Sequence, residues 1–419
     1  MYKNMVNTSS VTNYITNFSF DNNSVAGDRR KTEIDVLEIN RKPIKRFINE
    51  FWTSKQRQAS SIHEVSYRAC FKPQLPKFFI ELLTNKGDIV YDPFSGRGTT
   101  ILEAGLSGRN IISNDISPIC NILSKPRFFV PSLENIKKRL LEIPIDKFAK
   151  ANIDLSMFYH KDTEAEIVSL KNYLDIKKES GNGDYVDDWI RMVATNRLTG
   201  HSSGFFSVYT LPPNQAVTQE SQLKINKKRN QIPPYRNTKD IILKKSKSLI
   251  RNLTNEQKEN LRKAVEKSIF LQNDARNVSE IQSETVQLTV TSPPFLDIVQ
   301  YSSDNWLRCW FNSIDIKQIE KGITMSKTIQ NWSNVMDVVF KELYRITKPG
   351  GWVAFEVGEV RNGKIKLDEC IVPLGINAGF KCFGILINSQ KFTKTANIWG
   401  VNNNLSGTNT NRIVLFQKD

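Results

Sequence analysis

The most constraining feature of this 419-residue sequence is a short apolar segment that runs into two consecutive prolines. Residues 286–290 have the composition of a buried strand, and residues 291–295 read Thr-Ser-Pro-Pro-Phe. Because proline has no backbone N–H, a sheet ladder cannot continue through the pair. The sequence therefore predicts a buried strand that stops at a rigid turn poor in backbone donors.

The groups presented by this turn suit a planar ring that carries an exocyclic amine. The Ser292 hydroxyl and the Pro293 carbonyl can each accept an N–H, and Phe295 offers an aromatic face for stacking. With Pro294, these are the candidate catalytic residues. A plain strand followed by a proline turn is the simpler interpretation of the same residues. A second segment weighs against that interpretation.

The second segment is residues 92–100, Asp-Pro-Phe-Ser-Gly-Arg-Gly-Thr-Thr. It follows a predicted strand at 88–92, and its two glycines form a tight loop before a predicted helix at 99–106. The next predicted strand, 110–113, leads to Asp115. A strand, loop, helix, strand and acid in this order predict an α/β fold of Rossmann type.

The loop departs from the dinucleotide-binding pattern, because Ile101 occupies the position of the third glycine. No phosphate-binding P-loop is present either. An acid after each strand, Asp92 and Asp115, suits a nucleoside cofactor without phosphates. Asp115 would accept the ribose hydroxyls, and the loop N–H groups would hold a carboxylate. S-adenosylmethionine carries both groups, although other α/β domains also combine a glycine loop with an acid.

Composition narrows the class of protein further. The net charge of +16 favours a polyanionic partner, although a lysine-rich proteome would have the same effect. The five cysteines form no C-x-x-C pair and the three histidines lie far apart, so we expect reduced thiols and no metal site. No apolar run reaches the length of a membrane span. These features predict a cytoplasmic protein, in a bacterial cytosol.

Regular α/β alternation is interrupted between residues 151 and 265, where cations, amides and aromatic residues are mixed. Lys and Arg neutralise phosphates, and Asn, Gln and Arg read base edges, so this segment is typical of a DNA-reading insertion. A solvated, flexible insertion is the alternative. Residues 200–235 are expected to be loop-rich. The candidate DNA-binding residues are Lys227, Lys228, Arg229 and Arg236.

The N-terminal part has weaker signals. Residues 1–28 are expected to be poorly ordered, and the apolar residues between 34 and 52 are expected to pack on the main domain. The cations Lys42, Lys45 and Arg46 fit either a solvated helix face or a phosphate-contacting arm.

Taken together, the two motifs resemble those of the amino-methylating DNA methyltransferases, which methylate N4 of cytosine or N6 of adenine. Residues 92–100 match the family's cofactor loop, and residues 291–295 match its catalytic motif. The motif order resembles the family's alpha arrangement, which more often carries Asp-Pro-Pro-Tyr and acts on adenine. Ser-Pro-Pro is typical of the cytosine-N4 enzymes and favours that product.

The resemblance implies an S-adenosylmethionine-dependent methyltransferase sheet with an inserted target-recognition domain. The domains would be an N-terminal extension (1–60), a catalytic domain (61–150 and 266–419) and the insertion (151–265). It further implies double-stranded DNA as partner, a cognate restriction endonuclease, and no metal. The implied cofactor-binding residues are Phe71, Lys72, Pro73, Asp92, Pro93, Phe94, Gly96, Gly98, Thr99, Thr100, Asp115, Ile116, Asp274 and Ala275.

Methylation of an exocyclic amine needs few groups beyond the acceptors of the Ser-Pro-Pro turn and the cofactor. The lone pair of an exocyclic amine is delocalised into its ring, and accepting both N–H bonds favours a pyramidal, nucleophilic nitrogen. No cysteine lies in the Ser-Pro-Pro loop, which argues against methylation of cytosine C5. A base inside a duplex is out of reach, so base flipping is implied. The alternatives are N6-adenine methylation by the same site, an RNA substrate, or a non-catalytic DNA-binding protein with a relic cofactor fold.

Overall fold

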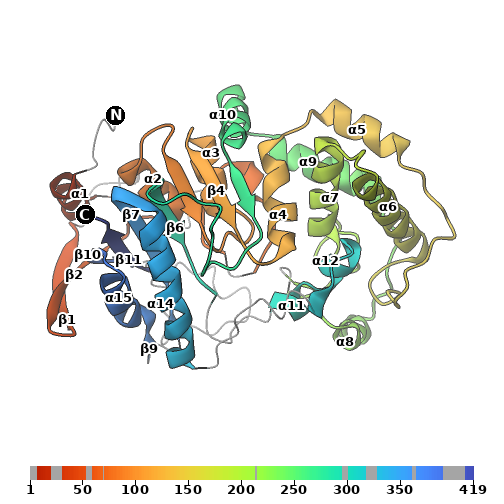
Figure 1. Cartoon of the computed structure of the whole chain (residues 1–419). Helices are drawn as coiled ribbons and strands as arrows, with labels where there is room; N and C mark the ends of the chain where they lie inside the picture. Colours follow the sequence, from red (N-terminus) through yellow and green to blue (C-terminus); the bar gives the residue numbers. More distant parts are fainter. Residues whose placement is uncertain are drawn as a thin grey trace, which may run out of the picture.

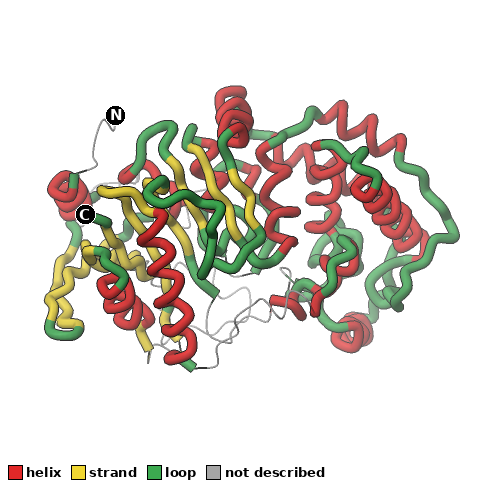
Figure 2. Tube along the Cα trace, viewed as in Figure 1, coloured by secondary structure: helices red, strands yellow, loops and turns green. Residues whose placement is uncertain are grey.

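The structure is a computed structural model that describes residues 7–19, 31–52, 59–68, 70–212, 215–294, 301–317, 328–360, 365–389 and 411–419. Phe295 lies outside the described residues. A sheet-based half and a helical half lie side by side (Figure 1). Figure 2 shows that the strands are confined to the first of these halves.

The strands of this half form a nine-stranded sheet, with a separate two-stranded ribbon, β8 (Glu359–Val360) and β9 (Ile365–Lys366). Five neighbouring strands are parallel, and β11 runs antiparallel to both of its neighbours. The order across the sheet is β1 (Glu33–Ile39), β2 (Lys42–Asn49), β10 (Lys381–Asn388), β11 (Asn411–Gln417), β7 (Thr347–Val357), β6 (Val286–Thr291), β3 (Ile89–Asp92), β4 (Asn110–Asn114) and β5 (Ile269–Leu271).

The chain reverses its direction of travel across the sheet between β3 and β6. From β3 it proceeds outward to β4 and β5, and it then returns to β6 and β7 on the other side. Such a reversal between parallel strands leaves a crevice at their carboxyl ends, which is the usual ligand site of an open α/β sheet. Both sequence motifs lie at this position. The predicted α/β fold is confirmed.

Helices cover both faces of the sheet. One face carries α2 (Gln74–Leu83), α3 (Thr99–Leu106) and α10 (Asn255–Glu266), and the other carries α14 (Ile329–Ile346) and α15 (Leu367–Asn377). On the second face the rings of Phe340 and Phe355 lie 4.9 Å apart. On the first, Asn260 donates to the Leu106 carbonyl, which ties α10 to α3. These apolar layers hold the strand ends in place.

The helical half comprises the helices between β4 and β5 other than α10, together with two that follow β6. It contains α5 (Leu133–Glu142), α6 (Lys161–Glu179), α7 (Tyr185–Arg197), α8 (Gln219–Arg229), α9 (Thr238–Ile250), α11 (Tyr301–Asp304) and α12 (Trp306–Phe311), with α4 (Pro118–Ser124) next to the sheet. We refer to α5–α9, α11 and α12 as the helical lobe. Because α11 and α12 come soon after the Ser-Pro-Pro motif, the chain runs from the catalytic motif directly onto this lobe.

Two expectations need correction. Residues 33–49 form the hairpin β1–β2, not a helix face, because Asn40 and Arg41 adopt positive φ angles of 49° and 61° and form a two-residue turn. In this hairpin Arg46 pairs with Asp35. Residues 200–235 are loop-rich as expected, and they also contain the unexpected helix α8, which Thr218 caps. The helix α1 (Thr8–Thr16) lies within the segment expected to be poorly ordered.

The division into domains stays a proposal. The hairpin extends the main sheet through parallel pairing of β2 with β10, and α10 packs on the sheet rather than on the helical lobe. We therefore propose that residues 31–52 belong structurally to the catalytic domain and that the insertion ends before α10.

Candidate functional site

The two sequence motifs meet at the switch point of the sheet. The Thr291 hydroxyl, at the end of β6, donates to the Asp92 carboxylate at the end of β3 over 2.7 Å. The Thr100 hydroxyl donates to the Val290 carbonyl over 3.0 Å, so the helix after the loop is joined to the same strand. Burial raises the pKa of Asp92 to about 7 despite the hydrogen bond from Thr291. Asp92 therefore acts mainly inside the protein, fixing the two motifs relative to each other.

A pocket of about 1130 Å³, the solvent at its mouth included, opens at this junction. Most of the predicted site residues line it. From the cofactor set these are Phe71, Asp92, Pro93, Phe94, Gly96, Thr99, Asp115, Ile116, Asp274 and Ala275, and from the catalytic set they are Ser292, Pro293 and Pro294.

Four predicted residues lie outside the pocket lining and have structural contacts instead. Lys72 and Pro73 precede α2, where Pro73 is the N-cap. Thr100 is buried against β6. Gly98 adopts φ 79° at the start of α3, and a Cβ there would lie 2.7 Å from the Ser124 Cβ. Gly98 is thus needed for the loop's shape and packing rather than for a direct ligand contact.

Asp115 ties the two loops at the bottom of the pocket together. Its carboxylate accepts from the Gly96 N–H over 2.9 Å and from the Ser117 N–H over 3.0 Å. Burial raises the pKa of this carboxyl group, and these two hydrogen bonds oppose the rise. The Gly98 N–H donates to the Ser95 carbonyl. The protein itself therefore occupies these two N–H groups, and the expectation that the loop holds a ligand carboxylate stays a prediction for its other N–H groups.

The loop after β5 brings Asp274 and Ala275 to the same pocket. The Asn114 side chain positions this loop, since it accepts from the Asn273 N–H over 2.9 Å and donates to the Asn273 carbonyl over 3.0 Å. Asp274 pairs with Arg276 at 2.5 Å. A second carboxylate thus faces the pocket from the strand beyond Asp115.

Glu356 is a site residue that the sequence analysis missed. It lies on β7, next to β6, and its buried carboxylate accepts a hydrogen bond from Asn411 over 3.0 Å. The Ser292 hydroxyl lies near enough to this carboxylate to oppose the rise in its pKa. Burial raises the pKa of Glu356 above its usual value. A single acid in the apolar segment 352–357 was the signal that could have identified it.

Trp332 is the second missed residue. From the first turns of α14 its indole N–H donates to the Pro294 carbonyl over 3.0 Å, and its ring lines the pocket. Val335, Met336 and Val339 of the same helix complete an apolar wall. Trp332 thereby fixes the orientation of the Pro-Pro turn while it shapes the cavity.

The segment 62–71 forms a further wall of the pocket through Tyr67, Arg68, Cys70 and Phe71. Arginine side chains hold its backbone from the cofactor side: Arg97 donates to the Val65 carbonyl over 2.8 Å and Arg127 to the Ile62 carbonyl over 3.1 Å. The helical lobe holds it from the other side. There Asn196 donates to the Ser66 carbonyl over 2.9 Å, and Arg68 pairs with Asp304 at 2.7 Å.

The four predicted DNA-binding residues differ in their surroundings. Lys227 and Lys228 are exposed at the end of α8. Arg229 stacks over the Tyr209 ring at 3.8 Å. Arg236 donates to the Ser202 and Phe205 carbonyls, each over 2.7 Å. The two arginines therefore contact the lobe itself, although Arg229 is exposed like the two lysines.

Among the described residues there is neither a cluster of metal ligands nor a helix fit to span a membrane. No group of three or more His, Cys, Asp or Glu side chains in the described part of the chain is placed to hold a metal ion. None of the described helices has the length and apolar character needed to cross a bilayer.

Comparisons with known proteins agree with this geometry. Residues 7–125 match the DNA methylase family model of N6 and N4 methyltransferases. The type II methyltransferase M.MjaII of Methanocaldococcus jannaschii is 33% identical over 91 residues, which cover 22% of this chain and 17% of that protein. M.BsoBI of Geobacillus stearothermophilus is 24% identical over 340 residues, 72% of this chain and 64% of that protein. The matches thus span less than two thirds of either relative.

Among solved structures, a putative DNA modification methylase from Thermus thermophilus, complexed with S-adenosyl-L-methionine, shares 22% identity over 35% of this chain and 53% of that chain, with a TM-score of 0.23. The family model and the type II relatives support an amino-methylating DNA methyltransferase, with N4 of cytosine and N6 of adenine not resolved as targets.

Proposed function

We propose that this protein transfers a methyl group from S-adenosylmethionine to N4 of cytosine in double-stranded DNA, as part of a restriction–modification system. The observation that carries the proposal is the contact between Thr291 and Asp92, which joins the cofactor loop and the Ser-Pro-Pro turn in one pocket. A non-catalytic DNA-binding protein with a relic cofactor fold would not need to keep both motifs intact around one cavity.

The pocket residues fit the proposed cofactor. Asp115 and Asp274 face the cavity as hydrogen-bond acceptors, and Phe94, Ile116 and Val335 provide apolar walls. Each Asp115 oxygen accepts one backbone N–H and keeps a lone pair for a ribose hydroxyl. Asp274 would accept from the adenine amino group. When bound, S-adenosylmethionine would supply an activated methyl group on a sulfonium leaving group.

Ser292 and Pro293 would align the amine of the flipped base. Because Trp332 already donates to the Pro294 carbonyl, the Pro293 carbonyl is the one that the turn offers to the substrate. With its proton directed toward the nearby Glu356, the Ser292 hydroxyl would keep its lone pairs for the amine N–H. Both acceptors stabilise positive charge as it develops on the nitrogen.

Glu356 provides a destination for the proton that the methylated nitrogen must lose. The proton would pass to the Ser292 oxygen while the Ser292 proton passes to Glu356, which leaves a neutral methylamino group and a protonated Glu356. The raised pKa of this buried carboxyl group favours it as the acceptor. Glu356 would release the proton to water in the next cycle.

The choice of cytosine rests on the residue type at position 292. Ser-Pro-Pro resembles the cytosine-N4 enzymes, and the Ser292 oxygen can accept an N–H from the cytosine edge that N4 forms with N3. Adenine presents a similar edge at N6 and N1, so N6-adenine methylation by the same residues is the alternative.

Transfer of isotopically labelled methyl groups from S-adenosylmethionine to unmethylated genomic DNA tests the proposal. We expect labelled duplex DNA with the natural chain and little label with Ser292→Ala. RNA as the better acceptor would refute DNA as the substrate. Failure of the natural chain to bind S-adenosylmethionine in calorimetry would favour the non-catalytic alternative.

A further inference from the structure

Two buried arginines of the helical lobe lack the counter-charge that burial requires. Arg197, at the end of α7, and Arg308, on α12, are each only 8% exposed. Within the described part of the chain neither guanidinium has an ion-pair partner. Arg197 donates to the backbone and side-chain oxygens of Asn196, and Arg308 donates to Asn305 and to the Ser66 carbonyl, all neutral acceptors. Such an arrangement is costly unless an anion completes it.

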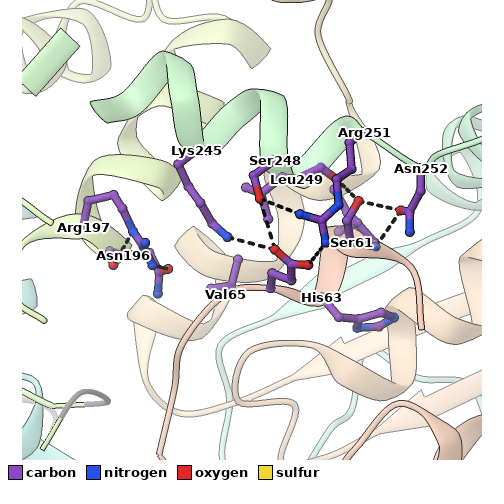
Figure 3. Close-up of polar contacts among 12 residues, drawn as sticks. Ser61, His63, Val65, Asn196, Arg197, Lys245, Ser248, Leu249, Arg251 and Asn252 are labelled. Carbon is purple, nitrogen blue, oxygen red and sulfur yellow. Dashed lines mark hydrogen bonds and ion pairs between the residues drawn. The ribbon is translucent and has the colours of Figure 1, made fainter. Parts of the chain in front are cut away.

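The acids nearest to this pair are engaged elsewhere. Glu64 pairs with Arg251 at 2.5 Å and with Lys245 at 3.4 Å, and it also accepts from Ser248. Figure 3 shows Arg197 bonded to Asn196 and set apart from the bonded group around Lys245, Ser248 and Arg251. Asp304 pairs with Arg68 at 2.7 Å. Two acids therefore face five cations in this part of the lobe, which leaves an excess of positive charge.

The aromatic rings beside the two arginines, and the repulsion between the two guanidinium groups, also indicate that an anion is needed here. The Arg197 guanidinium lies 3.9 Å from the centre of the Phe205 ring, and Arg308 lies 5.7 Å from that of Tyr67. Rings attract cations but do not neutralise them. Burial, followed by the positive charge of Arg308, lowers the pKa of Arg197 to about 10.

The position of the pair indicates which anion would reach it. Arg308 bonds the Ser66 carbonyl and faces Tyr67, and Tyr67 and Arg68 line the pocket where the reacting base would enter. A flipped base remains attached to its backbone phosphates, which must pass the mouth of this pocket. The charge that the pair lacks is thus the charge that the substrate brings.

We propose that Arg197 and Arg308 together bind one backbone phosphate of the DNA, next to the nucleotide that enters the pocket. This inference rests on the proposed function and adds a phosphate site that differs from the exposed lysines of α8. Arginine suits the role because its planar fork binds phosphate oxygens in pairs.

The salt dependence of duplex DNA binding, measured by fluorescence anisotropy without cofactor, tests the proposal. Arg197→Gln and Arg308→Gln should each lower the log–log slope by about 0.9, the value of one phosphate on B-DNA. The double variant should show the same single reduction, because both residues bind one phosphate. Unchanged slopes would overturn the proposal, and so would a double variant whose slope falls by the value of two phosphates.

Arg127→Gln is the matched control. Arg127 is fully buried and donates to backbone carbonyls, but it lies on the cofactor side of segment 62–71. It should lower the unfolding temperature without changing the slope. A slope reduced equally in Arg127→Gln would mean that the effect arises from loss of fold, and it would count against the site.

A second test uses thermal unfolding, so it depends neither on DNA binding nor on methyl transfer. In the natural chain, sodium sulfate should raise the unfolding temperature more than sodium chloride at equal ionic strength. Arg197→Gln should reduce this difference to the general stabilisation that sulfate gives any folded chain. If sulfate protects no better than chloride, the anion site is refuted even if the variants fail to fold. If Arg197→Gln loses part of the sulfate protection but the DNA slopes are unchanged, the site binds a free anion and the DNA proposal fails. Methyl transfer by the natural chain is assayed separately, so failure of the proposed function is recognised independently.

Discussion

The pocket at the carboxyl ends of the strands and the helical lobe differ in how their polar groups are used. In the pocket, buried hydrogen bonds such as that between Thr291 and Asp92 hold the site, and its surface groups remain directed at the cavity. In the lobe, cations that appear in the sequence as one basic segment divide between exposed lysines and arginines bound to the protein itself. A strand-end motif therefore predicts geometry well, whereas a basic run predicts charge but not which cations face a partner.

The largest effect is expected at the pocket, from Ser292→Ala. Losing one acceptor for the amine should lower kcat about 10²–10³-fold, as for other preorganised transition-state contacts. Affinity for S-adenosylmethionine should stay unchanged, because Ser292 acts on the base. Steady-state kinetics together with calorimetry check both. Full activity in this variant would refute the mechanism. It would also contradict the claim that polar groups of the pocket are directed at the substrate.

Glu356→Gln also tests the pocket, in particular whether Glu356 accepts the proton that the methylated nitrogen loses. We expect kcat to fall about 10²-fold, within the range of general base catalysis. The pH profile discriminates between roles: the carboxylate accepts a proton, so kcat of the natural chain should fall as pH drops through the raised pKa of Glu356. In the glutamine variant this acidic limb should be absent. An acidic limb that persists would show that Glu356 only packs against Ser292.

Asp115→Ala should weaken cofactor binding by about 1.5–3 kcal/mol, the loss of charge-assisted hydrogen bonds. The same carboxylate also accepts from Gly96 and Ser117, so a fall in unfolding temperature should accompany the loss. Asp115→Asn, which keeps one acceptor oxygen, serves as the control and should lose less affinity. Unchanged calorimetric affinity in the alanine variant would remove Asp115 from the site.

The smallest effects are expected in the lobe. They should distinguish lysines that contact DNA from arginines that stabilise the lobe. Lys227→Ala with Lys228→Ala should reduce the salt slope of DNA binding by about 0.9 for each phosphate that is no longer neutralised, with little change in stability. Arg236→Ala should instead lower the unfolding temperature, because Arg236 supports the Ser202 and Phe205 carbonyls. A slope that is identical to that of the natural chain in the lysine variant would show that this end of α8 faces away from DNA.

Local pattern was sufficient for the strand, loop and helix around residues 88–106 and for both motifs, because each depends on neighbours in sequence. Glu356 was missed because its role depends on β7 lying beside β6, which is decided by packing across the sheet. The same holds for Arg236, whose partners lie about 30 residues away. The hairpin β1–β2 was missed because its turn, Asn40 and Arg41, contains no glycine or proline.

The most direct test is mass spectrometry of nucleosides released from duplex DNA after incubation with the protein and S-adenosylmethionine. A pocket that presents Ser292 and the Pro293 carbonyl to a flipped base should yield N4-methylcytosine, and Ser292→Ala should yield far less. N6-methyladenine as the sole product would contradict the base assignment. The absence of any methylated nucleoside, with cofactor binding intact, would contradict the claim that the two motifs form one methyl-transfer site.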